Sequence, residues 1–158
     1  MILSAIEDRE LPVYGDGLQV RNWLHVSDHC RAINAAIERG EVGSTYLVGG
    51  DSALPNFEVA QRICQAVDAE LGRAAGTSRK LIRHVTDRPG HDRRYAVNSS
   101  FLRDSLDWHP LEQFENALPV LVRWYLQRKD CADTVRTGAY RRYFERQYKR
   151  RIFWMMSP

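Results

Sequence analysis

Short β-rich runs alternate with helical runs along this chain, and this alternation constrains the fold more than any other feature of the sequence. Extended runs between turn residues are expected at 11–14, 20–26, 44–50, 81–85 and 94–97. About four short strands in alternation with five or six helices favour an α/β domain over a helical bundle or a β-sandwich.

Apolar residues at helical spacing predict the helices between these runs. Residues 1–8 have the pattern of a helix end, Ser27 is expected to cap a helix that stops at Gly40, and the next helix opens at Pro55. The apolar faces of these two complete helices are expected to be Cys30, Ile33, Ala36 and Ile37 in the first, and Val59, Ile63, Val67 and Leu71 in the second. Further helices are expected at 98–106, at 112–128 with a disturbance at Pro119, and in the aromatic tail 138–151.

Length and charge limit the kinds of protein to which this chain can belong. The 158 residues suit a single domain, and the net charge of +3, from 23 Lys+Arg and 20 Asp+Glu, is too small to indicate a nucleic-acid-binding surface. No apolar run approaches the ~20 residues of a membrane span. Cys30, Cys64 and Cys131 lie too far apart for a zinc knuckle or a disulfide framework. We therefore expect a cytoplasmic protein with reduced thiols that binds neither nucleic acid nor membrane.

A dinucleotide cofactor needs a glycine-rich turn between an N-terminal strand and a helix, where backbone N–H groups hold its diphosphate. The sequence has no G-x-G-x-x-G or G-x-x-G-x-x-G after such a strand, and it has no Y-x-x-x-K pair. We therefore expect no cofactor-binding, catalytic or metal-binding residues in this chain, which excludes a self-contained nicotinamide enzyme.

Four segments could bind an anionic ligand that carries hydroxyl groups: "LPVYGDG", the arginine of "VRNW", "LPN", and the loop "DRPGHDRRY". Arg21 follows a tight glycine turn, and a guanidinium there can offer a planar fork to a phosphate. Taken alone, Arg21 is better explained as an exposed surface residue. A lone histidine such as His91 is commonly a surface or core residue. The alternative interpretation of His91 is that it forms a hydrogen bond to a ligand.

The order of these motifs resembles the C-terminal half of the dTDP-glucose 4,6-dehydratases, which are nucleotide-sugar enzymes of the extended short-chain dehydrogenase/reductase family in the NAD(P)-binding Rossmann superfamily. The resemblance is carried by "LPVYGDGLQVRNWLHVSDHCRAI", "DRPGHDRRYAVNSSFLRDSLDWHP" and "FENALPVLVRWYL". It implies an α/β substrate-binding lobe at residues 1–128 that lacks the N-terminal dinucleotide-binding half, followed at 129–158 by a linker and a basic, aromatic tail.

The resemblance also implies a role for each matched residue. Residues 12–14 are expected to line the nucleotide base, partly through the main chain, and Asn56 is expected to lie near the nucleotide. Arg21 and Arg88 are expected to bind the diphosphate, and residues 87–91 to close over diphosphate and sugar. The substrate-binding residues implied in this way are Pro12, Val13, Tyr14, Arg21, Asn56, Asp87, Arg88, Pro89, Gly90 and His91.

In the resembled family, the chemistry and the NAD site belong to the N-terminal half. The complete enzyme is a lyase that removes water from dTDP-glucose to form the 4-keto-6-deoxy sugar. The expected ligand is dTDP or a dTDP-sugar, and the expected partner is the missing N-terminal half, a full-length homologue or a second copy in a homodimer. A non-catalytic nucleotide-sugar-binding or assembly module and a degenerate remnant without a ligand are the alternatives.

Three positions depart from the family pattern: Asn22, Leu47 with Val48, and Pro119. Asn22 replaces a carboxylate that could have oriented Arg21, so weaker diphosphate binding is expected.

Overall fold

The structure, a computed structural model, describes residues 1–128. The chain divides into two compact units, Met1–Val122 and Arg123–Pro158, and helix α5 crosses the division. The expected linker and tail helix at 129–158, together with Cys131, lie outside the described residues.

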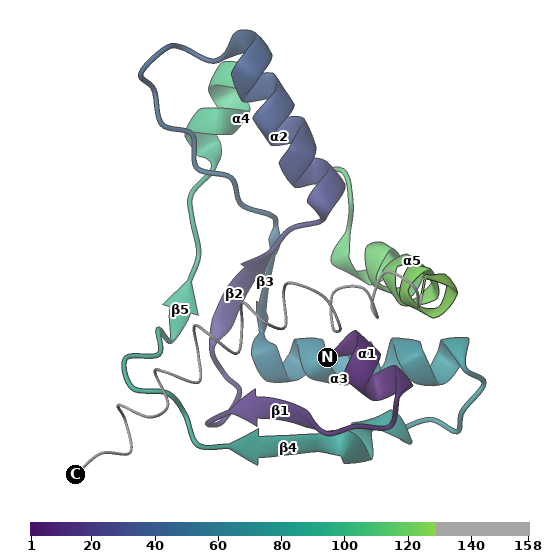
Figure 1. The fold of residues 1–158 in the computed structure, drawn as a ribbon. Coiled ribbons are helices and arrows are strands. Elements are labelled where there is room, and N and C mark those ends of the chain that lie inside the picture. Colours follow the sequence, from purple (N-terminus) through teal and green to yellow (C-terminus); the bar gives the residue numbers. More distant parts are fainter. Residues whose placement is uncertain (129–158) are drawn as a thin grey trace, which may run out of the picture. The chain divides into compact units, whose positions relative to one another are not determined.

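Helices and strands alternate as expected, which confirms the α/β class (Figure 1). The helices are α1 (Ile2–Ile6), α2 (Val26–Arg39), α3 (Asn56–Glu70), the 3-10 helix η1 (Ser78–Leu81), α4 (Ser100–Leu106) and α5 (Phe114–Gln127). The strands are β1 (Leu11–Tyr14), β2 (Val20–Trp23), β3 (Ser52–Pro55), β4 (Ile82–Val85) and β5 (Arg94–Tyr95). No helix within residues 1–128 has the length and apolar character needed to cross a membrane.

The five strands form two small sheets. Strand β1 pairs with β4 in parallel, with Leu11 opposite Ile82 and Tyr14 opposite Val85. Strand β2 lies between β3, which is antiparallel to it, and β5, which is parallel to it. Because parallel strands end at the same edge, the segments that follow β1 and β4 leave the first sheet side by side.

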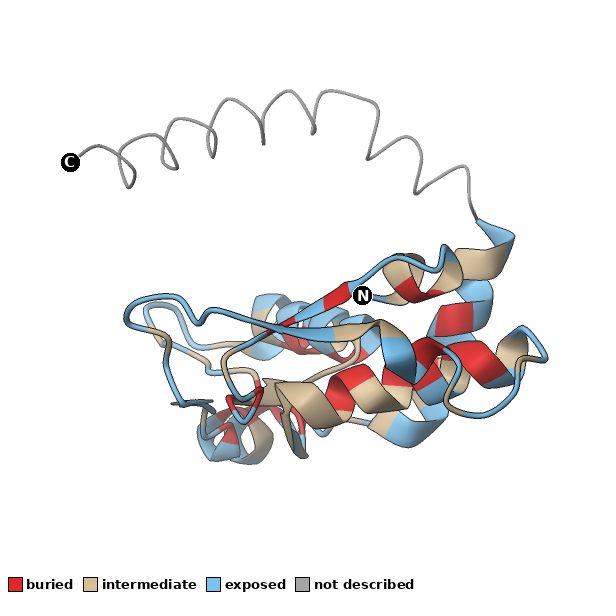
Figure 2. Ribbon diagram, turned by 90° about the horizontal axis from the view of Figure 1, so that it is seen from below, coloured by how far each residue is buried: buried red, intermediate tan, exposed pale blue. Residues whose placement is uncertain are grey.

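Helix α3 supplies the main core. It packs against α1, β1 and η1, and its buried face includes Val59, Ile63 and Val67, as the sequence predicted. Figure 2 shows buried stretches, in red, between intermediate and exposed ones along the helices. Leu71, expected on the same stripe, is instead an exposed residue at the end of the helix. A second cluster lies where α2 meets α4 and consists of Ala32, Ala35, Leu102, Leu106 and Trp108.

Helix α2 turns to the core a face that includes only Ala36 of the four residues expected there. Its buried residues are Asp28, Ala32 and Ala35, which recur at helical spacing and face α4 and Trp108. Ile33 and Ile37 lie on the exposed side, and the side chain of Ile37 is 78% exposed. The helix begins at Val26, and its N-cap is His25, whose ring accepts a hydrogen bond from the N–H of Ser27.

The run at 44–50 has the composition of a strand but is not one. Its burial alternates residue by residue from Ser44 to Val48, and Tyr46 and Val48 pack against the cluster between α2 and α4. Within residues 1–128 no strand pairs with it, and β2 pairs instead with Ser52–Pro55. A strand needs a hydrogen-bonded partner strand as well as a suitable composition, and this segment has no such partner in the described chain.

Candidate functional site

The "GDG" turn and the "DRPGH" loop meet at the edge where β1 and β4 end. The N–H of Gly15 donates to the carbonyl of Val85 at 2.8 Å, and His84 Nδ1 lies 2.8 Å from the carbonyl oxygen of Gly15. Gly15 has a φ of +56°, and a Cβ built on it would lie 2.9 Å from Asp87 Oδ2. Glycine is favoured at this position, because the backbone is left-handed and the Asp87 side chain occupies the space of a Cβ.

Asp87 organises the loop that follows β4. Its Oδ1 accepts from the N–H of Arg88 at 2.9 Å and lies 2.6 Å from His91 Nδ1, while its Oδ2 accepts from Gln19 Nε2 at 2.7 Å. The hydrogen bond with His91 is the largest cause that lowers the pKa of Asp87, and partial burial opposes it without prevailing. Asp87 is therefore a carboxylate at neutral pH, so Nδ1 of His91 carries a proton in this contact and Nε2 is the ring nitrogen left for another partner.

His91 itself is held firmly in place. Its side chain is 5% exposed, and its ring meets that of Tyr14 edge-to-face with 6.1 Å between centroids. The motifs at 12–14 and 87–91, far apart in the sequence, thus lie in contact.

Four arginines lie around the junction of the "GDG" turn with the "DRPGH" loop. They differ in whether a carboxylate already pairs with the guanidinium. Arg21 donates to the carbonyl oxygens of Val20 at 2.7 Å and Asp92 at 3.0 Å, and within residues 1–128 no carboxylate pairs with it. Arg93 is paired with Asp16 at 2.8 Å, and this hydrogen bond is the first cause that lowers the pKa of Asp16. Arg88 and Arg94 are exposed.

The neighbour of Arg21 does not orient it. Successive strand residues point to opposite faces, so a carboxylate at the position of Asn22 would face away from the Arg21 guanidinium. Two main-chain carbonyls hold Arg21 instead. Asn22 lies close to Gly49, and its Oδ1 is buried without a partner among the described residues.

The other expected residues divide by exposure. Asn56 is the first residue of α3, and its N–H donates to the carbonyl of Gln19 at 2.9 Å, which places it beside the junction. Pro12 and Tyr14 are exposed on β1, whereas the side chain of Val13 is 1% exposed and belongs to the core. Only the main chain of Val13 can contact a ligand. Pro89 and Gly90 form the exposed tip of the loop.

Gln19 was not among the expected site residues. It lies between the glycine turn and β2 and is 2% exposed. Its side-chain amide donates to Asp87, and its main-chain carbonyl accepts from the N–H of Asn56. The only signal in the sequence is a polar residue between Leu18 and Val20, which does not reveal the contact with a residue far along the chain.

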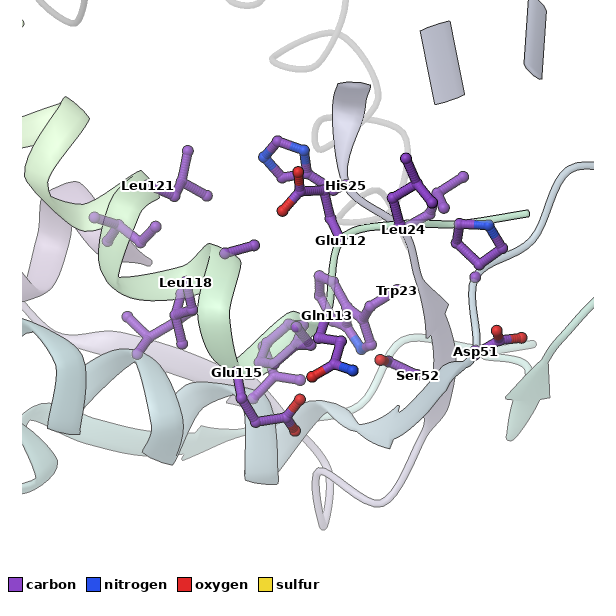
Figure 3. Close-up of a pocket in the computed structure, with 18 residues that line it drawn as sticks. Trp23, Leu24, His25, Asp51, Ser52, Glu112, Gln113, Glu115, Leu118 and Leu121 are labelled. Carbon is purple, nitrogen blue, oxygen red and sulfur yellow. The ribbon is translucent and has the colours of Figure 1, made fainter. Parts of the chain in front are cut away.

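A separate pocket of about 400 Å³ lies beside β2 and the start of α5 (Figure 3). Its walls are largely apolar, with Trp23, Leu24 and Leu118 among them, and its polar lining includes Asp51, Glu112 and Glu115. The described residues that line it include no lysine or arginine and none of the ten expected site residues. A diphosphate would meet carboxylates here, so the junction with the arginines is the better anion site.

The described residues do not fit the diphosphate of a dinucleotide cofactor. Three junctions lead from a strand into an α-helix within residues 1–128: β2 to α2, β3 to α3, and β5 to α4. None of these junctions contains a glycine, so no backbone cradle of the glycine-rich kind forms at them.

The thiols differ in environment. Cys64 is buried in α3, and burial is the main cause that raises its pKa to about 11, so it stays protonated at neutral pH. Cys30 is exposed on α2, whereas the sequence placed it on the apolar face of this helix.

Comparisons with known proteins show the family of this chain. The family model described as GDP-mannose 4,6 dehydratase matches residues 1–119. The chain is 49% identical over 142 residues to a dTDP-glucose 4,6-dehydratase of Xanthomonas campestris, covering 89% of this chain and 40% of the relative. It is 41% identical over 151 residues to the enzyme of that name from Salmonella typhimurium, covering 96% of this chain and 42% of the relative.

Solved structures give the same result. The dTDP-glucose 4,6-dehydratase of Bacillus anthracis, in complex with NAD, matches with a TM-score of 0.68 and 41% identity over 82% of this chain and 38% of that one. The enzyme DesIV of Streptomyces venezuelae, also solved with NAD, matches with a TM-score of 0.70 and 32% identity over the same shares. The chain thus spans about 40% of the length of the curated relatives. By these matches the chain belongs to the GDP-mannose 4,6-dehydratase family of nucleotide-sugar enzymes and is similar to the C-terminal half of the dTDP-glucose 4,6-dehydratases.

Proposed function

We propose that this chain supplies the nucleotide-sugar-binding surface of a dTDP-glucose 4,6-dehydratase-like lyase. The observation that carries the proposal is the junction of the "GDG" turn, Arg21 and the "DRPGH" loop, which Gly15, Gln19 and Asp87 join in one place. Its ligand is dTDP or a dTDP-sugar. In the complete enzyme, the reaction would be loss of water from dTDP-glucose to give the 4-keto-6-deoxy sugar, with NAD supplied by the remaining part of the enzyme.

Each proposed contact follows from the chemistry of the side chain. Arg21 exchanges its carbonyl partners for a phosphate oxygen, and Arg88 approaches the diphosphate from the loop. Residues Pro12 to Tyr14 offer an extended main chain and an exposed ring to the base, and Asn56 offers its amide nearby. Asp87 holds the loop, Pro89 and Gly90 form its tip, and His91 offers Nε2 to a ligand hydroxyl.

The test is calorimetric titration of the chain with dTDP. Loss of a charge-assisted contact in Arg21→Ala or Arg88→Ala should weaken binding roughly ten- to hundredfold. Arg9→Ala is the matched control, because Arg9 is exposed beside Glu7 and away from the junction. If both variants bind dTDP as tightly as the parent while keeping its melting temperature, the assignment of the two arginines is wrong.

A second function, assembly with a partner chain, is favoured by the unpaired segment at 44–48 and the apolar outer side of α2. No main-chain N–H from Thr45 to Val48 has a hydrogen-bond acceptor among the described residues. Ile33 and Ile37 on α2 and Leu47 in the segment are exposed. An extended segment with free main-chain groups suits addition to the edge of another sheet. The partner in this proposal is the N-terminal, NAD-binding part of such an enzyme, and a second copy or a full-length homologue is the competing occupant.

A further inference from the structure

Gln19 connects three parts of the fold. Its main-chain carbonyl accepts from Asn56 at the start of α3, its side-chain Nε2 donates to Asp87 at 2.7 Å, and it directly precedes β2. Among residues 1–128, Gln19 is the only donor to the Asp87 side chain from outside the loop 87–91, because the other two contacts come from Arg88 and His91.

The amide of Gln19 is not explained by stability alone. The residue is buried, and its Oε1 is buried without a hydrogen-bond partner among the described residues. Burying an unpaired amide oxygen is unfavourable, so an apolar side chain of similar size would suit folding better at this position. The remaining use of the amide is the hydrogen bond to Asp87.

Other contacts also hold this part of the chain: the ring of His91 packs edge-to-face on that of Tyr14, and the N–H of Val20 donates to the carbonyl of Arg93 at 2.8 Å. Arg93 pairs with Asp16 at the surface. Arg21 holds the carbonyl of Asp92 with the same guanidinium that is proposed to bind phosphate. The contact between Gln19 and Asp87 can persist when the ligand binds.

We propose that Gln19 is a positioning residue that fixes the "DRPGH" loop, through Asp87, in the arrangement that binds the nucleotide sugar before the ligand arrives. A loop fixed in advance loses less conformational freedom on binding and therefore gives higher affinity. The inference rests on the proposed function, because it assumes that this loop binds the ligand.

The decisive variant is Gln19→Glu. Above the pKa of the introduced carboxyl, two carboxylates face each other where the amide donated to Asp87, and the loop is pushed away. At lower pH the pair shares a proton, and the introduced carboxyl, once protonated, can again donate to Asp87. The other titratable or charged groups at this place are His91 on the loop, His84 on β4, Arg21 on β2, and the pair of Asp16 with Arg93.

The experiment measures dTDP affinity by calorimetry at several pH values between about 5.5 and 8, always as a ratio to the parent chain, so that ionisation of the dTDP phosphates cancels. We expect Gln19→Glu to bind more than tenfold more weakly than the parent at pH 8 and to approach the parent as the pH falls. Gln19→Leu should bind roughly tenfold more weakly at every pH. The control is Gln65→Glu, which makes the same change on the exposed side of α3 and should match the parent throughout.

Trypsin supplies a readout that needs no ligand. The bond between Arg93 and Arg94 should be cut several times faster in Gln19→Leu than in the parent if Gln19 holds the loop. A parent that does not bind dTDP refutes the proposed function, and the trypsin comparison then still decides whether Gln19 ties the loop. A parent that binds dTDP while Gln19→Glu and Gln19→Leu keep its affinity and its cleavage rate overturns the positioning role.

Discussion

Asp28 shows how one buried carboxylate can organise a distant segment. It is 0% exposed, and it accepts from the N–H groups of Leu111 at 3.1 Å and Glu112 at 3.0 Å as well as from Arg31 at 2.6 Å. Burial by itself raises the pKa of Asp28, but the hydrogen bonds from Arg31 and from the two main-chain N–H groups outweigh it and leave the pKa below its ordinary value. The segment that carries Trp108 to Glu112 is thereby fixed to α2.

We predict that Asp28→Asn lowers the free energy of unfolding at pH 7 by on the order of 2–4 kcal/mol, because an amide cannot accept from all three donors. Since the pKa of Asp28 is lower in the folded chain than in the unfolded chain, its contribution is present above about pH 4 and is lost as the pH falls further. Urea unfolding at pH 7 and pH 3 should show the gap between parent and variant shrinking at the lower pH. Asp104→Asn, on the exposed side of α4, serves as the control. A gap that stays constant with pH would contradict this account.

Single residues differ in how far the sequence reveals them. The arginines and the "DRPGH" loop stand out because their residue types suit an anion and their order matches a known family. The burial of Val13 and the contact between Gln19 and Asp87 could not be predicted, since both depend on which segments pack together. The same holds for Arg21, whose partners are main-chain carbonyls that no side-chain pattern indicates.

At the scale of helices and strands, local composition predicted most elements, and packing decided the rest. Helix α3 and strands β1 and β4 lie close to their expected places. The apolar patterns of α3 and β1 fit one buried face, whereas β4 has no buried residue and is held by its pairing with β1. Helix α2 was assigned the wrong face: alanines allow its close contact with α4, while its larger apolar residues face away. The segment 44–50 pairs with no strand within residues 1–128, so composition alone predicted a strand there wrongly.

The exposed side of α2, with Ile33 and Ile37, leads to a prediction about stability and assembly. Replacing Ile33 and Ile37 together with lysine should change the free energy of unfolding by no more than about 0.5 kcal/mol per site, because both side chains are exposed. The same change should reduce self-association and prevent assembly with the separately expressed N-terminal part of the Xanthomonas campestris relative. Light scattering and thermal unfolding, with and without that part, measure both effects.

Ile63→Lys is the matched control for this variant, since Ile63 is buried on α3 and its replacement should unfold the chain. If the double variant of α2 unfolds as readily as this control, its isoleucines belong to the core of the chain. If the double variant still assembles with the N-terminal part, the partner contacts another surface.

For the molecule as a whole, the chain alone should bind no NAD and form no 4-keto-6-deoxy product. The physical reason is that no strand-to-helix junction within residues 1–128 contains a glycine and that the sequence has no Y-x-x-x-K pair. Calorimetric titration with NAD and an assay for the product check this prediction, with the full-length Xanthomonas campestris relative as the positive control. A stoichiometric NAD isotherm from the chain alone would refute it.

The contact between Gly15 and Asp87 also has a consequence for the order of folding. It depends on the parallel pairing of β1 with β4, which joins segments as distant as Gly15 and His84, 69 residues apart. Closing so long a loop costs entropy before any contact repays it, so such pairings form late. A nascent chain whose residues 82–93 are still inside the ribosome already carries Arg21 but would lack the proposed nucleotide site. Affinity for dTDP would therefore arise only as folding is completed, and the nucleotide could serve as a probe of that last step.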